Sequence, residues 1–205
     1  MKSEVIVIIL LIAVFGSIYF LNQNLTGSSI VKFSEVQKDQ GVIIIPVKVH
    51  IIVDNSGRYT SNRNEENIIH TLNEANRIWS QGNIVFQIEE IQETRVDFNT
   101  IPLAINGNIF ELIEHENFDP NKINVFFTQS LNNINGLALS RINSVLVADF
   151  TTVNDFRTTA HEFGHLLGLR HVTSVNSLMA RGKNGEFLSQ AEIDIARENV
   201  GLLFR

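Results

Sequence analysis

The sequence predicts an α+β domain, in which one sheet of four to five strands packs with two long helices. Two observations support this class. Short runs rich in β-branched residues, each bounded by turn signals, predict strands, and apolar residues repeating at intervals of three and four predict helices. The two patterns alternate through residues 42–205, so we expect the strands and helices to share one hydrophobic core.

Length and composition suit one folded domain with an N-terminal appendage. The chain has 205 residues, and its 44% hydrophobic content is enough for a core. We predict a signal anchor or signal peptide at 1–21, a polar linker at 22–41 and the folded domain at 42–205. The net charge of −6, with no basic block, argues against a nucleic-acid partner. The chain has no cysteine, so the fold needs no disulfide. We expect the protein to be a monomer.

The N-terminal segment has the composition of a membrane or export signal. Val5 to Leu21 is uncharged and mainly apolar, which reaches the short end of the roughly 17 to 25 residues that span a bilayer. It is also longer than the usual apolar region of a cleaved signal peptide. We therefore favour a transmembrane signal anchor in the cell membrane, with the domain outside the cytoplasm. Secretion after signal cleavage remains the alternative.

Most elements of the domain can be assigned from local patterns. We predict strands at 42–53, 84–91 and 123–128 and an amphipathic helix at 64–81. A shorter helix is expected at 109–115. These segments provide most of the expected sheet and its first long helix.

Three histidines in this part of the chain have ordinary structural interpretations. His50 falls inside the first strand and is expected in the core or at a sheet edge. His70 lies off the apolar stripe of its helix and should be exposed. His115 has acidic neighbours that could indicate a second metal site, although a solvated helix face is the interpretation we favour.

The segment His161–His171 reads HEFGHLLGLRH and contains the candidate metal-binding and catalytic residues. His161 and His165 are four residues apart, so on a helix they project from one face. Gly168 can end that helix in the left-handed conformation and turn the chain back. His171 then becomes a third ligand. Three histidines that leave a fourth position open are typical of a catalytic zinc site.

Glu162 supplies the base that this chemistry requires. It follows His161 and can take a proton from water at the metal without binding the metal itself. A surface helix with an incidental histidine pair is the alternative, but it leaves Glu162, Gly168 and His171 unexplained. We predict one catalytic Zn²⁺; calcium is possible but not indicated.

The same segment carries a family resemblance. The full H-E-x-x-H-x-x-G-x-x-H pattern, followed by SLMA at 177–180, resembles the metzincin zinc metallopeptidases. Met179 looks like the methionine of the tight turn that underlies the zinc in that clan. The interval from His171 to Met179 is similar to that of the matrixin branch. Val172 stands where matrixins usually carry serine, so the subfamily is left unassigned.

The resemblance implies a fold and a mode of substrate binding. It implies a metzincin-like catalytic domain, with a twisted, mixed and mostly parallel sheet, an active-site helix and a C-terminal helix. In that clan the strand before the active-site helix forms the sheet edge beside the cleft. We expect 142–148 to be this strand and to pair with an extended substrate; an inner strand is the alternative. The candidate substrate-binding residues are Ile142, Val145, Leu146 and Val147.

The two helices of the C-terminal part have clear sequence signals. The active-site helix should begin near Asn154 and Asp155, which offer capping side chains. Ser189 and Glu192 have the spacing of a capping box for the last helix, and Gly201 should end it.

Together these features predict a zinc-dependent endopeptidase that cleaves extended protein or peptide substrates through a metal-activated water. An exported zinc-binding module without proteolytic activity is the alternative, and an enzyme that only processes or trims particular peptides is a third possibility.

Overall fold

The structure is a computed structural model that describes residues 41–204. The predicted N-terminal segment at 1–21 lies outside these residues, as does all but the last residue of the predicted linker at 22–41. Within the described residues, none of the helices combines the length and the apolar composition needed to cross a membrane. The membrane assignment of the N-terminal segment therefore stays a prediction.

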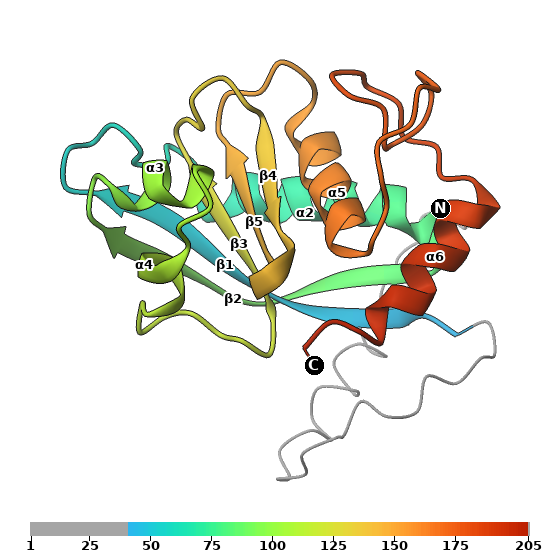
Figure 1. The fold of residues 1–205 in the computed structure, drawn as a ribbon, viewed down its shortest axis with the longest axis horizontal. Helices are drawn as coiled ribbons and strands as arrows, with labels where there is room; N and C mark the ends of the chain where they lie inside the picture. The colour runs from blue at the N-terminus through green and yellow to red at the C-terminus, as the bar shows by residue number, and fades with distance from the viewer. Residues whose placement is uncertain (1–40, 205) are drawn as a thin grey trace, which may run out of the picture. The chain divides into compact units, whose positions relative to one another are not determined.

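The described residues form an α+β fold around a five-stranded mixed sheet, as the sequence predicts (Figure 1). The strand order is β2-β1-β3-β5-β4, with β4 antiparallel to β5 and the other pairs parallel. The elements are β1 (Ile43–Asp54), α2 (Glu65–Trp79), η1 (Ser80–Gly82), β2 (Ile84–Val96), α3 (Thr100–Ile105), α4 (Phe110–Ile113), β3 (Ile123–Thr128), β4 (Gly136–Leu139), η2 (Ser140–Ile142), β5 (Ser144–Ala148), α5 (Asp155–Leu166) and α6 (Gln190–Val200).

The alternation of side chains along the inner strands separates two hydrophobic clusters. In β3, Val125 and Phe127 belong to the larger cluster, whereas Phe126 between them belongs to the smaller one. The larger cluster packs the sheet against α2, α5 and α6, and the smaller one packs its other face against α3 and α4. Both faces of β3 are therefore covered, which explains its unbroken apolar composition.

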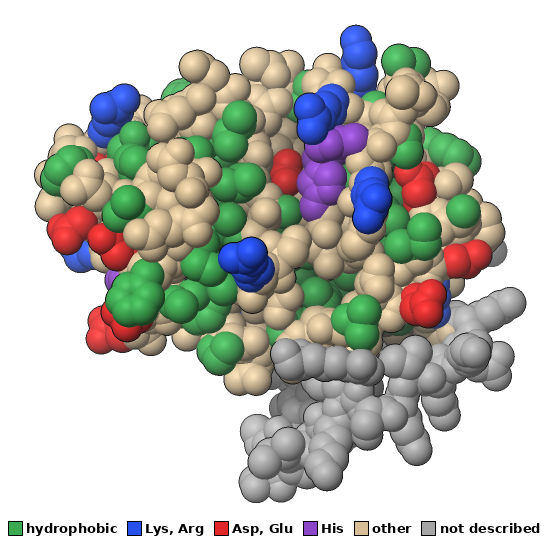
Figure 2. Space-filling view, viewed as in Figure 1, with side chains coloured by type: hydrophobic (Ala, Val, Ile, Leu, Met, Phe, Trp, Pro, Cys, Tyr) green, Lys and Arg blue, Asp and Glu red, His purple; other side chains and the backbone are tan. Residues whose placement is uncertain are grey.

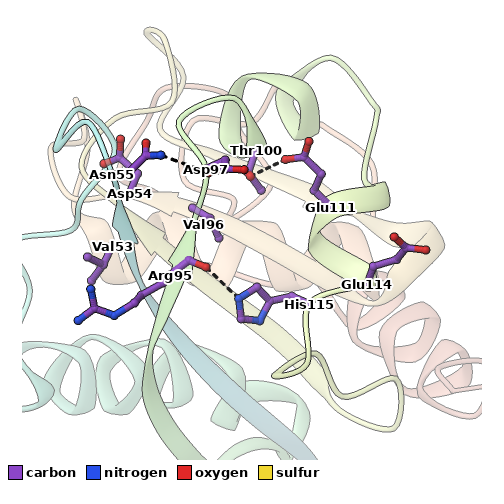
Figure 3. A pocket seen from close by; sticks show the side chains of 10 residues that line it. All are labelled: Val53, Asp54, Asn55, Arg95, Val96, Asp97, Thr100, Glu111, Glu114 and His115. Carbon is purple, nitrogen blue, oxygen red and sulfur yellow. Dashed lines mark hydrogen bonds between the residues drawn. The ribbon is translucent and has the colours of Figure 1, made fainter.

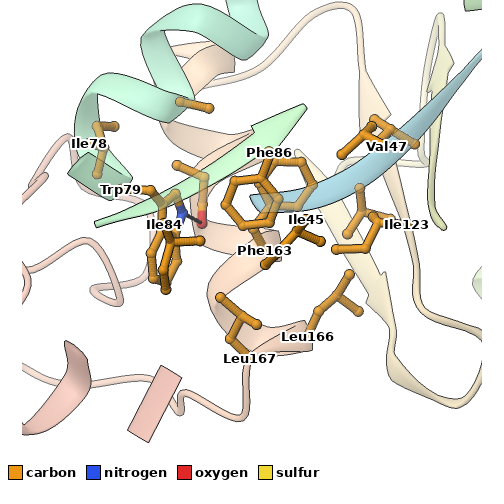
Figure 4. Packing of buried hydrophobic residues seen from close by; sticks show 14 of the residues in the cluster. Ile45, Val47, Ile78, Trp79, Ile84, Phe86, Ile123, Phe163, Leu166 and Leu167 are labelled. Atoms are coloured by element: carbon orange, nitrogen blue, oxygen red, sulfur yellow. Dashed lines mark hydrogen bonds between the residues drawn. The ribbon is translucent and has the colours of Figure 1, made fainter. Parts of the chain in front are cut away.

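Aromatic packing joins α2, β2 and α5 at the centre of the larger cluster (Figure 4). The rings of Phe86 and Phe163 stack with their centroids 3.9 Å apart. The Trp79 indole Nε1–H donates to the Ala160 carbonyl at 3.0 Å, so α2 is fixed directly to α5. Trp79 is fully buried, and its polar atom has the partner that a buried indole requires.

Two long helices begin with a capping box, and the sequence predicted the second of them. Asn64 accepts a hydrogen bond from the Asn67 N–H, and the Asn67 side chain accepts from the Asn64 N–H in return. Ser189 and Glu192 form the predicted capping box of α6. Asn154 precedes α5 as predicted, although its side chain makes no capping bond.

The predicted edge strand is wrong. Residues 142–148 do not form one strand at the sheet edge, because Ile142 closes the short helix η2 and the chain enters β5 only after Asn143, which has a left-handed φ of 46°. β5 lies between β3 and β4, and β4 is the edge. The β-branched composition of β5 reflects burial between two neighbouring strands, which is why it gave the stronger sequence signal.

Candidate metal centre

Helix α5 carries His161 and His165 on one face and ends where the sequence predicts. Gly168 has a φ of +81°, a conformation that residues with a Cβ adopt at a cost. A Cβ built on Gly168 would lie 2.1 Å from the Asn199 amide nitrogen. That amide donates to the Leu167 carbonyl at 3.1 Å, so a side chain of α6 helps to cap the end of α5. The chain then turns back toward the helix.

This turn brings three imidazole rings together. The Nε2 atom of His171 lies 3.1 Å from that of His161 and 3.2 Å from that of His165. Within residues 41–204, these three side chains are the only group of histidines and acidic residues whose ligand atoms converge closely enough to hold a metal ion. The predicted convergence of His161, His165 and His171 is thus present in the structure.

The spacing of these atoms fits a single zinc ion. Two nitrogens bound tetrahedrally at about 2.0–2.1 Å from zinc lie roughly 3.3 Å apart, close to both distances. The His161 Nδ1–H donates to the Leu178 carbonyl at 2.7 Å, and the His165 Nδ1–H donates to the Leu169 carbonyl at 2.9 Å. These bonds direct the Nε2 lone pairs inward, as ligand histidines require. Burial lowers the pKa of His161 to about 4, so its imidazole is neutral at neutral pH.

His171 has a different outer partner. The Arg181 Nε atom lies 3.0 Å from its Nδ1 atom. His171 lies at the surface, whereas His161 is buried. Figure 2 shows histidine side chains reaching the surface, with Lys and Arg side chains beside them. The centre is therefore open to solvent on the His171 side.

Glu162 lies between the metal-ligand face of α5 and the sheet edge. Its side chain is buried, with 7% exposed. Burial raises its pKa to about 7, against the opposing effect of a hydrogen bond from the Ala138 backbone N–H and the charge of Arg157. Ala138 belongs to β4, which runs beside α5 (Figure 1). A carboxyl group with a pKa near neutrality can both accept and return a proton.

Gly136 makes room for this carboxyl group. A Cβ on Gly136 would lie 2.7 Å from the Glu162 Cγ and 2.9 Å from the Thr158 Cγ2. Both distances are shorter than atoms in contact allow. The first residue of the edge strand must therefore lack a side chain for α5 to approach it this closely.

Met179 packs against α5 at Gly164, the residue before His165. It is fully buried, and its Sδ atom would lie 2.6 Å from a Cβ built on Gly164 of α5. The Met179 carbonyl accepts the Val172 N–H at 3.1 Å, which links the methionine turn to the residue after His171.

The predicted substrate-binding residues lie in less accessible positions. The side chains of Val145, Leu146 and Val147 are fully buried in β5, and Ile142 lies in η2. The residues that line the free edge instead belong to β4, which the sequence interpretation missed. Asn135-Gly136 is a typical turn signal, and the four residues of β4 contain no β-branched side chain.

The remaining histidines lie outside this centre. His50 is buried in the core, where its ring bonds to the side chains of Thr94 at 2.9 Å and Asn124 at 3.0 Å. Burial lowers its pKa to about 4. His70 is exposed, as predicted. The His115 Nε2–H donates to the Arg95 carbonyl at 2.9 Å, and the Asn117 N–H donates to its Nδ1.

A separate hollow of about 610 Å³ adjoins His115 (Figure 3). Several of its polar groups bond to one another. Asn55 donates to Asp97 at 3.2 Å, and Thr100 donates to Glu111 at 2.6 Å. Within the described residues, no set of ligand atoms converges there. A second metal site at His115 is therefore not supported.

Comparison with known proteins bears on the family and the fold of the chain. The family model described as Matrixin matches residues 28–196. Among solved structures, archaemetzincin from Methanopyrus kandleri is similar over 81% of this chain and 99% of its own, with a TM-score of 0.53 and 10% identity. Metalloproteinase-II from Bacteroides fragilis aligns with 78% of this chain and 54% of its own, with a TM-score of 0.49 and 13% identity. No curated protein matches the sequence.

Proposed function

Because the chain belongs to the matrixin family of zinc metallopeptidases, we propose that it is an endopeptidase that cleaves extended protein or peptide chains, with Glu162 as the general base. The observation that carries this proposal is the convergence of three imidazoles, two of them on α5, beside a buried carboxyl group of the same helix. His161, His165 and His171 would hold the zinc.

The chemistry divides between the metal and Glu162. When bound, zinc supplies Lewis acidity, which stabilises negative charge on oxygen and makes water easier to deprotonate. Glu162 accepts the proton of the attacking water and delivers it to the nitrogen of the departing amine. Its pKa of about 7 suits both steps near neutral pH. The Ala138 N–H keeps the carboxyl group directed toward the sheet edge.

The free edge of β4 supports an extended substrate. β4 pairs with β5 on one side only. On its other side the Ala138 N–H donates to Glu162, and the remaining backbone N–H and C=O groups of that side are the ones a further strand would pair with. A peptide that pairs with this edge would lie next to Glu162, which contacts Ala138 of the same strand. Main-chain pairing of this kind requires an extended substrate and places few demands on its side chains.

The test is the Glu162→Gln variant of the full chain, with Glu198→Gln as a matched control. Glu198 is exposed on α6, so its loss changes charge without touching the centre. Glu162→Gln should keep its zinc but lose cleavage of casein and of a peptide library, while Glu198→Gln cleaves normally. Cleavage by Glu162→Gln would refute the assigned base. Wild-type protein that binds zinc but cleaves nothing would favour a binding module.

Mapping the cleaved bonds separates endopeptidase action from trimming. Products cut within the peptides support the proposal, whereas products shortened only at their ends contradict it.

We also propose that 5–21 exports the domain and anchors it in the cell membrane. The uncharged apolar run supports this. Fractionation of cells that express the full chain, with N-terminal sequencing of the product, distinguishes an anchored chain from one secreted after cleavage. A soluble cytoplasmic product would contradict both forms.

A further inference from the structure

Arg157 is a buried cation whose only part in the proposed chemistry so far is its charge, which opposes the rise in the pKa of Glu162. It lies on α5 one turn before His161, so the two side chains project from the same face of the helix. Only 3% of Arg157 is exposed. Within the described part of the chain, no ion pair joins it to a carboxylate.

Backbone carbonyls of the methionine turn and the following loop surround the guanidinium. Arg157 Nη2 donates to the Leu178 and Ala180 carbonyls, which flank Met179, and its Nε–H donates to the Gly185 carbonyl at 3.2 Å. One side chain of α5 therefore binds the segment that follows His171 at three points.

The Leu178 carbonyl links Arg157 to a metal ligand. It accepts both the Arg157 guanidinium and the His161 Nδ1–H. The direction of the Nδ1–H bond sets the direction of the Nε2 lone pair on the same ring, because the imidazole is rigid. Whatever holds the Leu178 carbonyl in place therefore also orients the donor atom of His161.

A charge in this position is costly for stability alone. Burying a cation that forms no ion pair carries a desolvation penalty that carbonyl dipoles offset only in part. Burial lowers the pKa of Arg157, against the opposing charge of Glu162. An apolar side chain of similar length could fill the same volume. Such an apolar side chain could not form the three hydrogen bonds that Arg157 donates to backbone carbonyls.

We propose that Arg157 is a positioning residue that holds the methionine turn against α5 and thereby pre-orients His161 for the metal. This inference rests on the proposed function, since it assumes that the three histidines bind zinc. It extends that function by assigning part of the zinc affinity to a side chain that touches neither metal nor substrate.

The test compares Arg157→Met and Arg157→Lys with the wild-type full chain, and uses Arg95→Met as the matched control. Arg95 is exposed on β2 at the opposite edge of the sheet. Zinc affinity is measured by competition with a chromogenic chelator. A nitrogen–proton correlation spectrum of the histidine rings reports the His161 Nδ1–H bond directly.

Arg157→Met should bind zinc about ten- to a hundredfold more weakly, as for other losses of outer partners, and the His161 Nδ1–H signal should shift or broaden. Arg157→Lys keeps the positive charge but has fewer directed donors. Its zinc affinity should therefore fall between those of the wild type and Arg157→Met. Arg95→Met should match wild type.

A folded Arg157→Met variant with wild-type zinc affinity and an unchanged His161 signal overturns the proposal. If that variant does not fold, wild-type behaviour of Arg157→Lys in both measurements overturns it equally. Wild-type protein that binds no zinc has a different meaning, because it contradicts the proposed function itself.

Discussion

Gly136 shows how much of the centre depends on single residues. It carries no chemistry, but only a residue without a Cβ allows the edge strand to approach Glu162 as closely as it does. The requirement is for space at the point where β4 meets α5. The proposed active site thus depends on Gly136, a residue that a search for reactive side chains would not select.

Gly136→Ala should retain zinc but lose most of the peptidase activity. The new Cβ would lie 2.7 Å from the Glu162 Cγ, which forces the carboxyl group to move. A displacement of about 1 Å in a reacting group can cost on the order of a hundredfold in rate. Peptide cleavage and zinc content are measured together, with Ser140→Ala, an exposed site in the same hairpin, as the control. Undiminished cleavage would show that Glu162 tolerates the shift.

His50 should make the protein sensitive to mild acid. Burial lowers its pKa from 6.5 to about 4, opposed by the Asn124 hydrogen bond and by Glu90 and reinforced by the charges of Lys48 and His115. Below pH 6.5 the unfolded chain gains a proton at His50 that the folded chain accepts only near pH 4. Stability is therefore lost as the pH falls through this window, by about 3 kcal/mol at most.

The measurement is urea unfolding of wild type and His50→Gln at pH 7 and pH 4.5. Other titrating groups are common to both proteins, so the difference between the two losses isolates His50. Wild type should lose more of its unfolding free energy than the variant. Equal losses would mean that His50 titrates normally in the folded protein.

At the scale of single helices and strands, the sequence predicted those elements whose formation depends on residues close together in the chain. β3 occupies residues 123–128 as predicted, since a fully buried strand has an unbroken apolar sequence. The capping box of α6 was also predictable, because it depends only on Ser189 and Glu192 at the helix start. β4 could not be predicted in this way, because its four residues form a strand only by pairing with β5.

Ser189→Ala tests whether the capping box at α6 contributes as the structure indicates. The Ser189 hydroxyl accepts from the Glu192 N–H, and the Glu192 carboxylate accepts from the Ser189 N–H. Loss of the cap should lower the unfolding free energy by about 1 kcal/mol, measured by urea denaturation. Ser174→Ala, at an exposed loop position, should have no such effect. An unchanged urea midpoint for Ser189→Ala would show that the capping box does not stabilise α6.

At the scale of the whole molecule, the centre is assembled from segments that are distant in sequence. Glu162 meets Ala138 and Gly136 of the edge strand, and His161 meets Leu178 of the methionine turn. The histidine pattern predicted the ligands because their spacing follows helix geometry. The contacts of Arg157 and Gly136 depend on how the sheet and the turn pack against α5, which no local pattern encodes.

Zinc should stabilise the folded domain because the three ligands come together only in the folded chain. A ligand present at a thousand times its dissociation constant stabilises by about 4 kcal/mol. Chelation should therefore lower the thermal midpoint of the wild-type full chain, measured by calorimetry. His70→Ala, at an exposed site on α2, should keep this response, whereas His171→Ala should lose it. The same response in His171→Ala would place the stabilising metal elsewhere.

The most direct test is the metal content of the purified, undenatured full chain, measured by mass spectrometry after exhaustive dialysis. The structure predicts one zinc per chain in the wild type and in Glu162→Gln, and almost none in His165→Ala. A wild-type protein without stoichiometric zinc, or a His165→Ala variant that retains it, would contradict the three-histidine centre.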